Sequence, residues 1–542
     1  MVLFTTVTRS FKASSRMFGS IGSKSCLFST LSHDIPTSPP ASGRGSAVLS
    51  LLPSYLTSTP PPSSAPPLLN LSIAENRINN SQDLLTAKMT SLQESSHGQF
   101  TPDMIYYQNT YGTEGCREAF ASYLSSTFLP KRNHKRNQNQ KNASHGFTFG
   151  FTFNPSCLTV GAGCNAVLEN LIFCLSDVGE GVMIPCPYYA TFAFDLGARA
   201  QAKILPVRMP HMPHMPHMGE QQPGQQQQQP GQQQLRKSDY YPTLATLNAS
   251  YDAGVEAGVT PRILLLSNPN NPLGICYPPE VLKMCFDFVV EKEMHLISDE
   301  IYGGSTFNEE GAESESNSDS KFTSIASIAS FTTTSSSTST SSSSTSSSSS
   351  SSTTTSPSSP SPSHYLHPRA HLVYALSKDF ALSGLRVGAC YTENESVLAP
   401  LRKLNDLCQV SSSTQKIVEG MLRDEKWVTR FSRSNLSKVK GRYDRLAKLL
   451  KREGVEFLRA EAGLYVWMDL RPYLRPYLRP QGGGEGELSD RLVNEYGLRF
   501  TPGESMEMNE GGYFRFVFTA VDDGDFDTAM GRFEDFLRSE KQ

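Results

Sequence analysis

The order of residues predicts an α/β fold with a buried, mainly parallel sheet. Apolar runs of strand length alternate along the chain with longer segments of helical periodicity. Some runs are continuously apolar, as in strands buried on both faces of a parallel sheet. Acidic, basic and amide side chains directly follow several runs, where an open α/β sheet presents its ligand-binding edge. These observations predict a mixed, mainly parallel sheet flanked by helices.

The first predicted elements lie in the first 185 residues. Residues 115–128 (GCREAFASYLSSTF) have apolar side chains at helical spacing and predict an amphipathic helix. Residues 157–160 predict a short strand, and residues 167–175 predict the helix that follows it after a turn of small residues. Residues 181–184 are apolar and end at Pro185, which predicts a buried strand that stops where proline cannot donate a ladder hydrogen bond.

The next elements continue the alternation of strand and helix. Residues 262–266 (RILLL) are the clearest continuous apolar run and predict a central strand. Residues 278–293 predict a helix, and residues 295–297 and 371–375 (HLVYA) predict two further strands. Strands separated by helices are typical of a parallel sheet, because parallel neighbours need a crossover connection.

The C-terminal part of the chain has a different pattern. After about residue 396 the sequence predicts long charged helices, such as the one at 437–453. Short strands are predicted at 463–470 and 513–519. We therefore expect a smaller α+β domain at 396–542, after a large domain at 65–395 that includes an N-terminal segment.

Several segments differ from the patterned chain. Residues 1–33 are basic, rich in Ser and free of acidic side chains, which is typical of an organelle transit peptide. We therefore expect a mitochondrial or plastid location, and otherwise a cytoplasmic one. Residues 34–64 predict a Ser/Pro-rich linker. Long low-complexity surface insertions are predicted at residues 131–145, 209–234, 308–363 and 471–487.

The composition excludes several classes of protein. The 542 residues include 49 Lys and Arg and 52 Asp and Glu, and a net charge of −3 argues against a nucleic acid or an acidic membrane surface as the main partner. No stretch approaches the roughly 18 apolar residues of a membrane-spanning helix. Ten cysteines form no C-x-x-C pair, so no metal site is predicted. His211, His214 and His217 could bind a soft metal, but a repeat within a loop is the better interpretation.

Three charged side chains are predicted to lie at the ligand-binding edge of the sheet. Asp299 and Lys378 each follow a predicted strand, and Arg386 lies in a turn eight residues after Lys378. A lysine can form a Schiff base with a carbonyl group, an acid can pair with a ring nitrogen, and an arginine can hold a phosphate. Together they favour an anionic, carbonyl-bearing cofactor over an isolated surface ion pair.

Two loops fit the same kind of ligand. Residues 266–274 (LSNPNNPLG) follow the central strand and can aim one Asn side chain inward. Residues 160–165 (VGAGCN) are small and precede a helix, so backbone amides at the helix N-terminus could approach a phosphate. Each loop taken alone would equally fit a plain tight turn.

A set of motifs in order resembles the class I/II aminotransferase family, which has pyridoxal 5'-phosphate as cofactor and the fold called type I. The resemblance covers the chain from about residue 69 to the C-terminus. The tripeptide Ala74-Glu75-Asn76, with Tyr107 downstream, is most similar to the branch that contains 1-aminocyclopropane-1-carboxylate synthases. The family motifs are GAGCN (161–165), PCPYYATF (185–192), NPNNPLG (268–274), SDEIY (298–302), LSKDFALSGLRVG (376–388) and GGYFRFVF (511–518).

The resemblance implies a role for each residue that contacts the cofactor ring. Lys378 would hold the cofactor as a Schiff base and move the substrate proton, and Asp299 would keep the ring nitrogen protonated. Asn271 and Tyr302 would bond the phenolic oxygen of the ring, which favours its ionised form. Tyr189 would stack on the ring face.

The resemblance also implies a phosphate site and a substrate site. The amides of Gly163 and Cys164, the Ser377 side chain and Arg386 would bind the phosphate. Arg515 would bind the substrate α-carboxylate through two parallel hydrogen bonds. Glu75 matches a substrate-site glutamate of the cyclopropane-forming branch.

The chain departs from the family pattern at several positions. Ala375 stands where a phosphate-binding Ser is common, and Ala190-Thr191 replace Pro-Gly. Thr110 occupies the place of a Tyr that reaches the cofactor phosphate of the partner subunit in that branch. Tyr107 or Tyr111 could replace it in a homodimer.

The resemblance implies a pyridoxal-phosphate-dependent aminotransferase that moves an amino group from an α-amino acid to an α-keto acid. The first alternative is a 1-aminocyclopropane-1-carboxylate synthase, a lyase that acts on S-adenosylmethionine. A more remote alternative is a non-catalytic, cofactor-binding regulator. Residues 1–64 contain no helix-turn-helix pattern, and Lys378, Asp299 and Arg515 are all present, so an enzyme is favoured.

Overall fold

The computed structural model describes residues 48–57, 61–79, 81–130, 151–209, 235–307, 322–333, 363–474 and 484–539. The predicted transit peptide 1–33 and the predicted insertion 131–145 lie outside the described residues. So does most of the predicted insertion 209–234, with the repeated histidines. Among the described helices, none has the length and apolar character that crossing a membrane requires.

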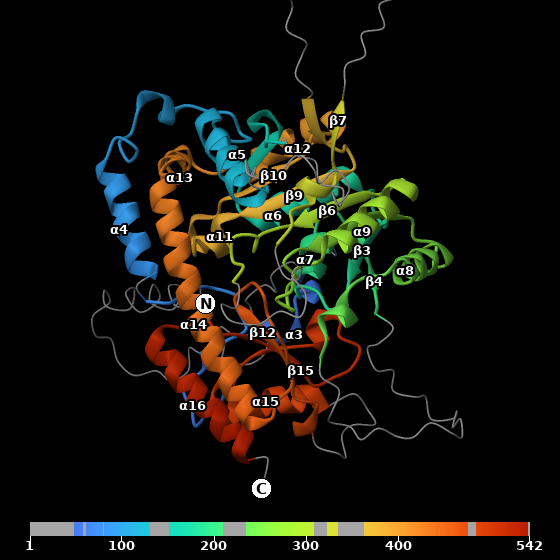
Figure 1. Cartoon of the computed structure of the whole chain (residues 1–542), viewed down its shortest axis with the longest axis vertical. Helices are drawn as coiled ribbons and strands as arrows, with labels where there is room; N and C mark the ends of the chain where they lie inside the picture. The colour runs from blue at the N-terminus through green and yellow to red at the C-terminus, as the bar shows by residue number, and fades with distance from the viewer. Residues whose placement is uncertain are drawn as a thin grey trace, which may run out of the picture. The chain divides into compact units, whose positions relative to one another are not determined.

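A seven-stranded sheet carries the residues of interest (Figure 1). Neighbouring strands are parallel except at β10, which is antiparallel to both β2 and β9. The mixed, mainly parallel sheet predicted from the sequence is thus confirmed, with the run at 262–266 in β5, an interior strand between β6 and β3. The strand order is β2 (Leu158–Gly161), β10 (Gly388–Tyr391), β9 (Ala370–Ala375), β6 (His295–Asp299), β5 (Pro261–Ser267), β3 (Gly181–Pro185) and β4 (Lys203–Val207).

Helices flank this sheet, as predicted. α6 packs against β2, β9 and β10, and α8 packs against β3, β4 and β5. Each buries one apolar face, which removes the strand side chains from water. The helices of this part are α3 (Ser54–Thr57), α4 (Ser81–Glu94), α5 (Glu114–Phe128), α6 (Cys164–Leu175), α7 (Phe192–Gly197), α8 (Leu244–Glu256), α9 (Pro279–Glu291), α11 (Leu376–Asp379), α12 (Glu395–Leu404) and α13 (Ser412–Arg423).

A second, smaller sheet lies in the C-terminal part of the chain and confirms the predicted α+β region. Its four antiparallel strands are β11 (Phe457–Leu458), β12 (Tyr465–Asp469), β15 (Tyr513–Val517) and β14 (Thr501–Pro502). The accompanying helices are α14 (Glu425–Glu453), α15 (Gly484–Tyr496) and α16 (Asp523–Ser539). The short strand β1 (Leu69–Asn70) pairs in parallel with β13 (Leu498–Arg499), so the segment before the Ala-Glu-Asn motif is attached to this C-terminal part.

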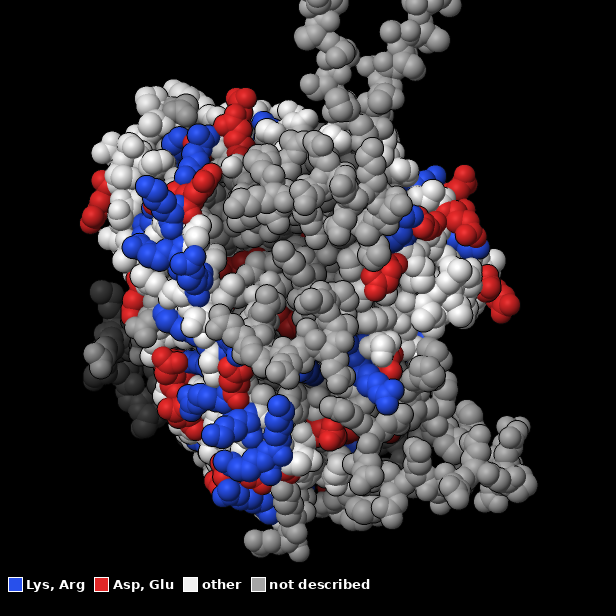
Figure 2. Space-filling view, in the orientation of Figure 1, with Lys and Arg blue, Asp and Glu red and all other residues white. Residues whose placement is uncertain are grey.

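The long helix α14 has defined ends and contacts both parts. Its first turn is capped by Asp424, whose carboxylate accepts a hydrogen bond from the Trp427 amide at 3.0 Å. It ends at Gly454, whose φ of 69° is a left-handed conformation that glycine adopts without strain. Phe431 of α14 stacks on Phe380, just after Lys378, with 5.9 Å between ring centroids. Figure 2 shows charges of both signs interspersed over α14 and α16, where Arg442 and Arg445 form ion pairs with α16 carboxylates.

The predicted insertion 308–363 was partly wrong, because residues 322–333 belong to the fold. They form α10 (Ile325–Ile328) and β7 (Ser330–Thr333), and β7 pairs with β8 (Ser363–Leu366). Ile325 is fully buried, and its amide donates to the Glu300 carboxylate at 2.7 Å. The short apolar run SIASIASF lies between polar segments, so the predicted insertion included it.

The predicted insertion 471–487 also extends too far. Arg471 pairs with the carboxylates of Asp469 at 2.6 Å and Glu510 at 2.8 Å. Glu485 is 1% exposed and accepts the Glu504 amide at 2.8 Å. Within that predicted range, only 475–483 lie outside the described residues. The repeat RPYLRPYLRP and the Gly run predict an insertion, but Arg471 and Glu485 at its two ends are paired with the fold.

The predicted linker 34–64 and the predicted insertion 209–234 also need correction. Each contains an isolated apolar side chain that the structure buries. Tyr55 lies in the predicted linker 34–64 but is 9% exposed and packs into the hydrophobic core. Met209, the first residue of the predicted insertion 209–234, is also buried in that core. A single apolar side chain gives no periodicity, so the sequence pattern does not reveal its burial.

Candidate active site

A cavity of about 290 Å³ opens at the carboxyl ends of the central strands. It brings together most of the site residues predicted from the sequence, although they come from distant parts of the chain. The predicted residues that line it are Cys164, Tyr189, Asn271, Asp299, Tyr302, Ser377, Lys378, Arg386 and Arg515.

Lys378 presents a buried amine to this cavity. It lies in the short helix α11, directly after β9, and its Nζ donates to the Ala74 carbonyl oxygen at 2.6 Å. The pKa of the amine is lowered to about 8, chiefly by burial and then by the positive charge of Arg515, against which the charge of Glu75 raises it. A substantial neutral fraction is therefore present at mildly alkaline pH, and only the neutral amine is nucleophilic or basic.

Asp299 presents a buried carboxylate at the end of β6. Its Oδ1 accepts hydrogen bonds from the Ile301 amide at 3.2 Å and from the Cys164 thiol at 3.6 Å. Burial raises its pKa to about 6, while these hydrogen bonds and the charge of Lys378 lower it. A cationic ring nitrogen would compensate this buried negative charge.

Gly163 and Arg386 form a cradle that fits an anion. Gly163 precedes α6 with φ of 89°, and a Cβ there would lie 2.4 Å from Nη2 of Arg386. No side chain caps the N-terminus of α6, so its first amides are available to a ligand. The Gly163 amide itself donates to the Gly161 carbonyl oxygen at 2.7 Å, and its role as a phosphate donor stays a prediction. Gly163 also makes room for the guanidinium group.

Polar and aromatic side chains line the cavity between the predicted cofactor site and the predicted substrate site at Arg515. Asn271 accepts a hydrogen bond from Nη1 of Arg515 through its Oδ1 at 2.7 Å, which leaves its amide nitrogen for a ligand. Tyr302 meets Tyr465 edge-on, with 5.4 Å between ring centroids. Tyr189 meets Phe192 edge-on at 5.4 Å and lines the cavity. Ser377 lines it next to Lys378 and is 5% exposed.

Arg515 is held in place but keeps one donor free. It is 1% exposed, and its Nη2 donates to the Ser72 carbonyl oxygen at 2.6 Å and to the Thr501 hydroxyl at 3.0 Å. Its Nε is buried without a hydrogen-bond partner among the described residues. A buried, incompletely satisfied guanidinium group lining a cavity fits a carboxylate ligand.

Glu75 lies beside the cavity rather than in its lining. Its carboxylate pairs with Arg77 at 2.7 Å and accepts the Ser383 hydroxyl at 3.2 Å. Its side chain is 31% exposed. Its negative charge raises the pKa of Lys378.

The two tyrosines predicted as possible contacts with a partner subunit differ in their surroundings. Tyr111 is enclosed by two guanidinium groups, Arg402 at 4.2 Å and Arg117 at 5.1 Å from its ring centroid. Tyr107 is 98% exposed. Neither lines the cavity of its own chain, and neither does Thr110.

Sequence patterns missed several lining residues. Tyr55 and Leu56 come from α3, in the predicted linker. Asp195 comes from α7; it is 4% exposed and is held by Asn165, whose Nδ2 lies 2.9 Å from each carboxylate oxygen. The one available signal for Asp195 was a single acid in an otherwise apolar hexapeptide (FAFDLG).

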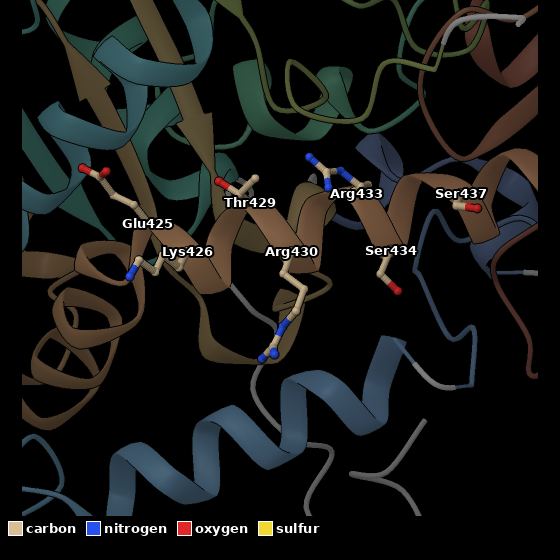
Figure 3. A pocket seen from close by; sticks show the side chains of 7 residues that line it. All are labelled: Glu425, Lys426, Thr429, Arg430, Arg433, Ser434 and Ser437. Atoms are coloured by element: carbon tan, nitrogen blue, oxygen red, sulfur yellow. The ribbon is translucent and has the colours of Figure 1, made fainter.

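A second hollow lies along α14, but it lacks a comparable set of groups. Its lining side chains all belong to one helix and are strung along it rather than converging (Figure 3). They are Glu425, Lys426, Thr429, Arg430, Arg433, Ser434 and Ser437. Among the described residues, no group of His, Cys, Asp and Glu could hold a metal ion.

Comparison with known proteins shows which family the chain belongs to. The family model described as aminotransferase class I and II matches residues 66–533. The chain is 30% identical to 1-aminocyclopropane-1-carboxylate synthase 3 of Oryza sativa subsp. japonica, over 88% of each protein. It is 31% identical to 1-aminocyclopropane-1-carboxylate synthase 2 of Cucurbita pepo, where the match covers 71% of this chain and 65% of the relative, just under two thirds of its length.

Solved structures show the same fold at lower sequence identity. The aromatic aminotransferase of Pyrococcus horikoshii superposes with a TM-score of 0.61 and 18% identity, over 92% of this chain and 99% of that protein. The aspartate aminotransferase of Thermotoga maritima superposes with a TM-score of 0.56 and 18% identity, over 87% and 92%.

The cofactor of this family fits the residues present. Pyridoxal phosphate carries a carbonyl group, a ring nitrogen and a phosphate, and the cavity offers an amine, a carboxylate and the cradle that Gly163 leaves open. The motifs lie within residues 66–533, the part of the chain that the family model matches. The chain is a pyridoxal-phosphate-dependent enzyme and belongs to the class I and II aminotransferase family.

Proposed function

We propose that this enzyme is an aminotransferase that moves the amino group of an α-amino acid to an α-keto acid. The observation that carries the proposal is the convergence of Lys378, Asp299 and Arg515 in one buried cavity. An amine, an acid for the ring nitrogen and a carboxylate-binding guanidinium group are sufficient for this reaction.

Each part of the cofactor has a counterpart in the cavity. Arg386, Ser377 and the Cys164 amide would hold the phosphate, and Asp299 would hold the ring nitrogen. Asn271 and Tyr302 would bond the phenolic oxygen. Bound there, pyridoxal phosphate supplies an electron-withdrawing ring that stabilises negative charge on the α-carbon of an attached amino acid.

The chain's own residues move the proton and orient the substrate. Arg515 would bind the α-carboxylate through the Nε that has no partner among the described residues. That contact fixes the rotation of the substrate, so that its α-hydrogen faces Lys378. Because burial lowers its pKa to about 8, the Lys378 amine can accept the α-proton and then return it.

A second candidate function is that of a 1-aminocyclopropane-1-carboxylate synthase. It is supported by the names of the relatives at about 30% identity and by Glu75, which matches that branch. In this reaction the α-carbon of S-adenosylmethionine would bond to the γ-carbon, and the bond from the γ-carbon to the sulfonium sulfur would break, which releases methylthioadenosine. Glu75 is bound by Arg77 and Ser383 and stands outside the cavity lining, so transamination remains the first choice.

One experiment separates these functions. The purified holoenzyme is offered ¹⁵N-labelled amino acids with an α-keto acid, and separately S-adenosylmethionine. Transamination predicts that ¹⁵N passes to the keto acid. Release of methylthioadenosine without a keto acid would overturn the choice in favour of the synthase. A cofactor-binding regulator would consume neither substrate.

We also propose that the enzyme works as a homodimer, in which Tyr107 rather than Tyr111 reaches the partner subunit. The family resemblance and the 98% exposure of Tyr107 support this. Sedimentation equilibrium of wild type and Tyr107→Ala tests the proposal, together with the affinity of each for the cofactor.

A mitochondrial or plastid location is proposed from residues 1–33 and is tested by fusing them to a fluorescent protein in a photosynthetic cell.

A further inference from the structure

The Asp299 carboxylate is held on one oxygen only. Oδ1 accepts both the Ile301 amide and the Cys164 thiol. No described residue donates to Oδ2, which leaves that oxygen for a ligand in the cavity. Two donors on Oδ1 fix the carboxylate plane, because rotation about the Cβ–Cγ bond would break both hydrogen bonds.

The surroundings of Cys164 keep its proton on sulfur. As the first residue of α6, its thiol would ordinarily have a lowered pKa, because helix N-termini favour anions. Here burial raises the thiol pKa well above its usual range, and the charges of Asp299 and Asp195 raise it further. A protonated thiol is a donor and a thiolate is not, so Cys164 donates to Asp299 throughout the neutral range.

A neutral donor suits this position better than a cation would. A lysine or arginine bonded to Asp299 would compensate its negative charge and weaken its attraction for a protonated ring nitrogen. A thiol and a backbone amide orient the carboxylate and leave its charge in place. Cys164 is 9% exposed and begins α6, and the neighbouring Asn165 donates to the Asp195 carboxylate.

We propose that Cys164 is a positioning residue whose thiol orients the Asp299 carboxylate toward the ring nitrogen of the cofactor. The inference goes beyond the role of the Cys164 amide at the phosphate, and it rests on the assignment of Asp299 to the ring nitrogen in the proposed function. The side chain at residue 164 would therefore influence the affinity of the enzyme for the cofactor ring.

The test uses ligand binding, independent of turnover. The apoenzyme is titrated with pyridoxine 5'-phosphate and with its 1-deaza analogue, in which carbon replaces the ring nitrogen. Neither ligand has an aldehyde, so neither bonds covalently to Lys378. Variants are Cys164→Ala, Cys164→Ser, Asp299→Asn and the matched control Cys174→Ala, at a half-buried cysteine of the same helix outside the cavity.

The variants should differ in their affinity for the two ligands. Cys164→Ala should bind pyridoxine phosphate about three- to tenfold more weakly, the effect of one lost hydrogen bond, and should bind the deaza analogue as wild type does. Cys164→Ser keeps a donor and should restore affinity, and Cys174→Ala should change nothing. Equal loss for both ligands, or no loss for either, would overturn the proposal.

Asp299→Asn separates this inference from the assignment on which it rests. If Asp299→Asn does not discriminate between the two ligands, the assignment of Asp299 to the ring nitrogen is wrong. If Asp299→Asn discriminates and Cys164→Ala does not, the assignment stands and the role of the thiol is refuted. Thermal unfolding of each apoenzyme shows which variants are folded.

Discussion

The Lys378 amine donates a hydrogen bond to the Ala74 carbonyl oxygen at 2.6 Å, across 304 positions of sequence. Ala74 follows β1, which is attached to the C-terminal part, whereas Lys378 follows β9 of the seven-stranded sheet. A carbonyl oxygen holds the amine without adding a full negative charge. It therefore fixes the position of the amine while leaving burial to lower its pKa.

Removal of the Lys378 amine is expected to abolish covalent attachment of the cofactor. Borohydride reduction of the holoenzyme followed by peptide mass spectrometry should place the cofactor on Lys378, and Lys378→Ala should carry none there. Lys440→Ala, which removes an exposed amine that pairs with Asp444, is the control. A reduced adduct that persists on Lys378→Ala at another lysine would contradict the assignment.

Replacement of Arg515 is expected to affect the substrate more than the cofactor. Arg515→Lys keeps the charge but loses the forked geometry, so KM for the amino acid should rise about ten- to a hundredfold. Cofactor affinity should change less, although Asn271 loses its contact with Nη1. Steady-state kinetics and cofactor titration measure the two effects, and an unchanged KM would remove Arg515 from the substrate site.

Gly163→Ala is expected to weaken cofactor binding by displacing Arg386, because the new Cβ would lie 2.4 Å from its Nη2. Gly179→Ala is a matched control, since Gly179 has a similar φ of 85° but open space around it. Both variants place alanine at a positive φ, which strains the backbone by about 1–3 kcal/mol. Only Gly163→Ala should lower cofactor affinity in equilibrium dialysis.

Deletion of the N-terminal residues is expected to have two distinct effects. Removal of residues 1–47 leaves α3 in place and should preserve kcat and KM. Removal of residues 1–60 also takes Tyr55 and Leu56 from the cavity lining and should raise KM. The matched variant Tyr55→Ala in the full chain checks that the side chain is responsible.

A buried histidine and its half-buried neighbour are expected to make stability depend on pH. His371 is fully buried between Thr392 and His295, whose ring nitrogen lies 3.1 Å from it. Burial lowers the pKa of His295 to about 4 and lowers that of His371 as well. Because the unfolded state then binds more protons, stability is lost as pH falls below about 6.5, by at most ~1.4 kcal/mol per pH unit for each histidine.

The difference between variants isolates this effect from the carboxyl groups. The pKa values of Asp195 and Glu300 are raised by burial, so these groups work in the opposite direction over the same range. His371→Gln keeps hydrogen-bonding capacity without titrating, and urea unfolding at pH 7.5 and 5.5 should show a smaller loss of stability than in wild type. An equal loss in both proteins would rule out a contribution from His371.

The strands and the order of motifs could be predicted because they are local features. The run at 262–266 is apolar because its strand is buried on both faces, and Asp299 is the last residue of its strand. Where the local signal was weak, prediction failed. Tyr55 stands alone among Ser and Pro, and residues 322–333 are a short apolar run between polar segments.

The sequence by itself determined the fold class and the family, and it predicted the residues that would contact the cofactor. Only the tertiary structure decided which atoms of the chain meet: the Lys378 amine with Ala74, the Cys164 thiol with Asp299, and the Gly163 amide with Gly161. Periodicity and spacing describe neighbours along the chain. Contacts between distant segments depend on how the two sheets pack and on which donors the backbone has already used.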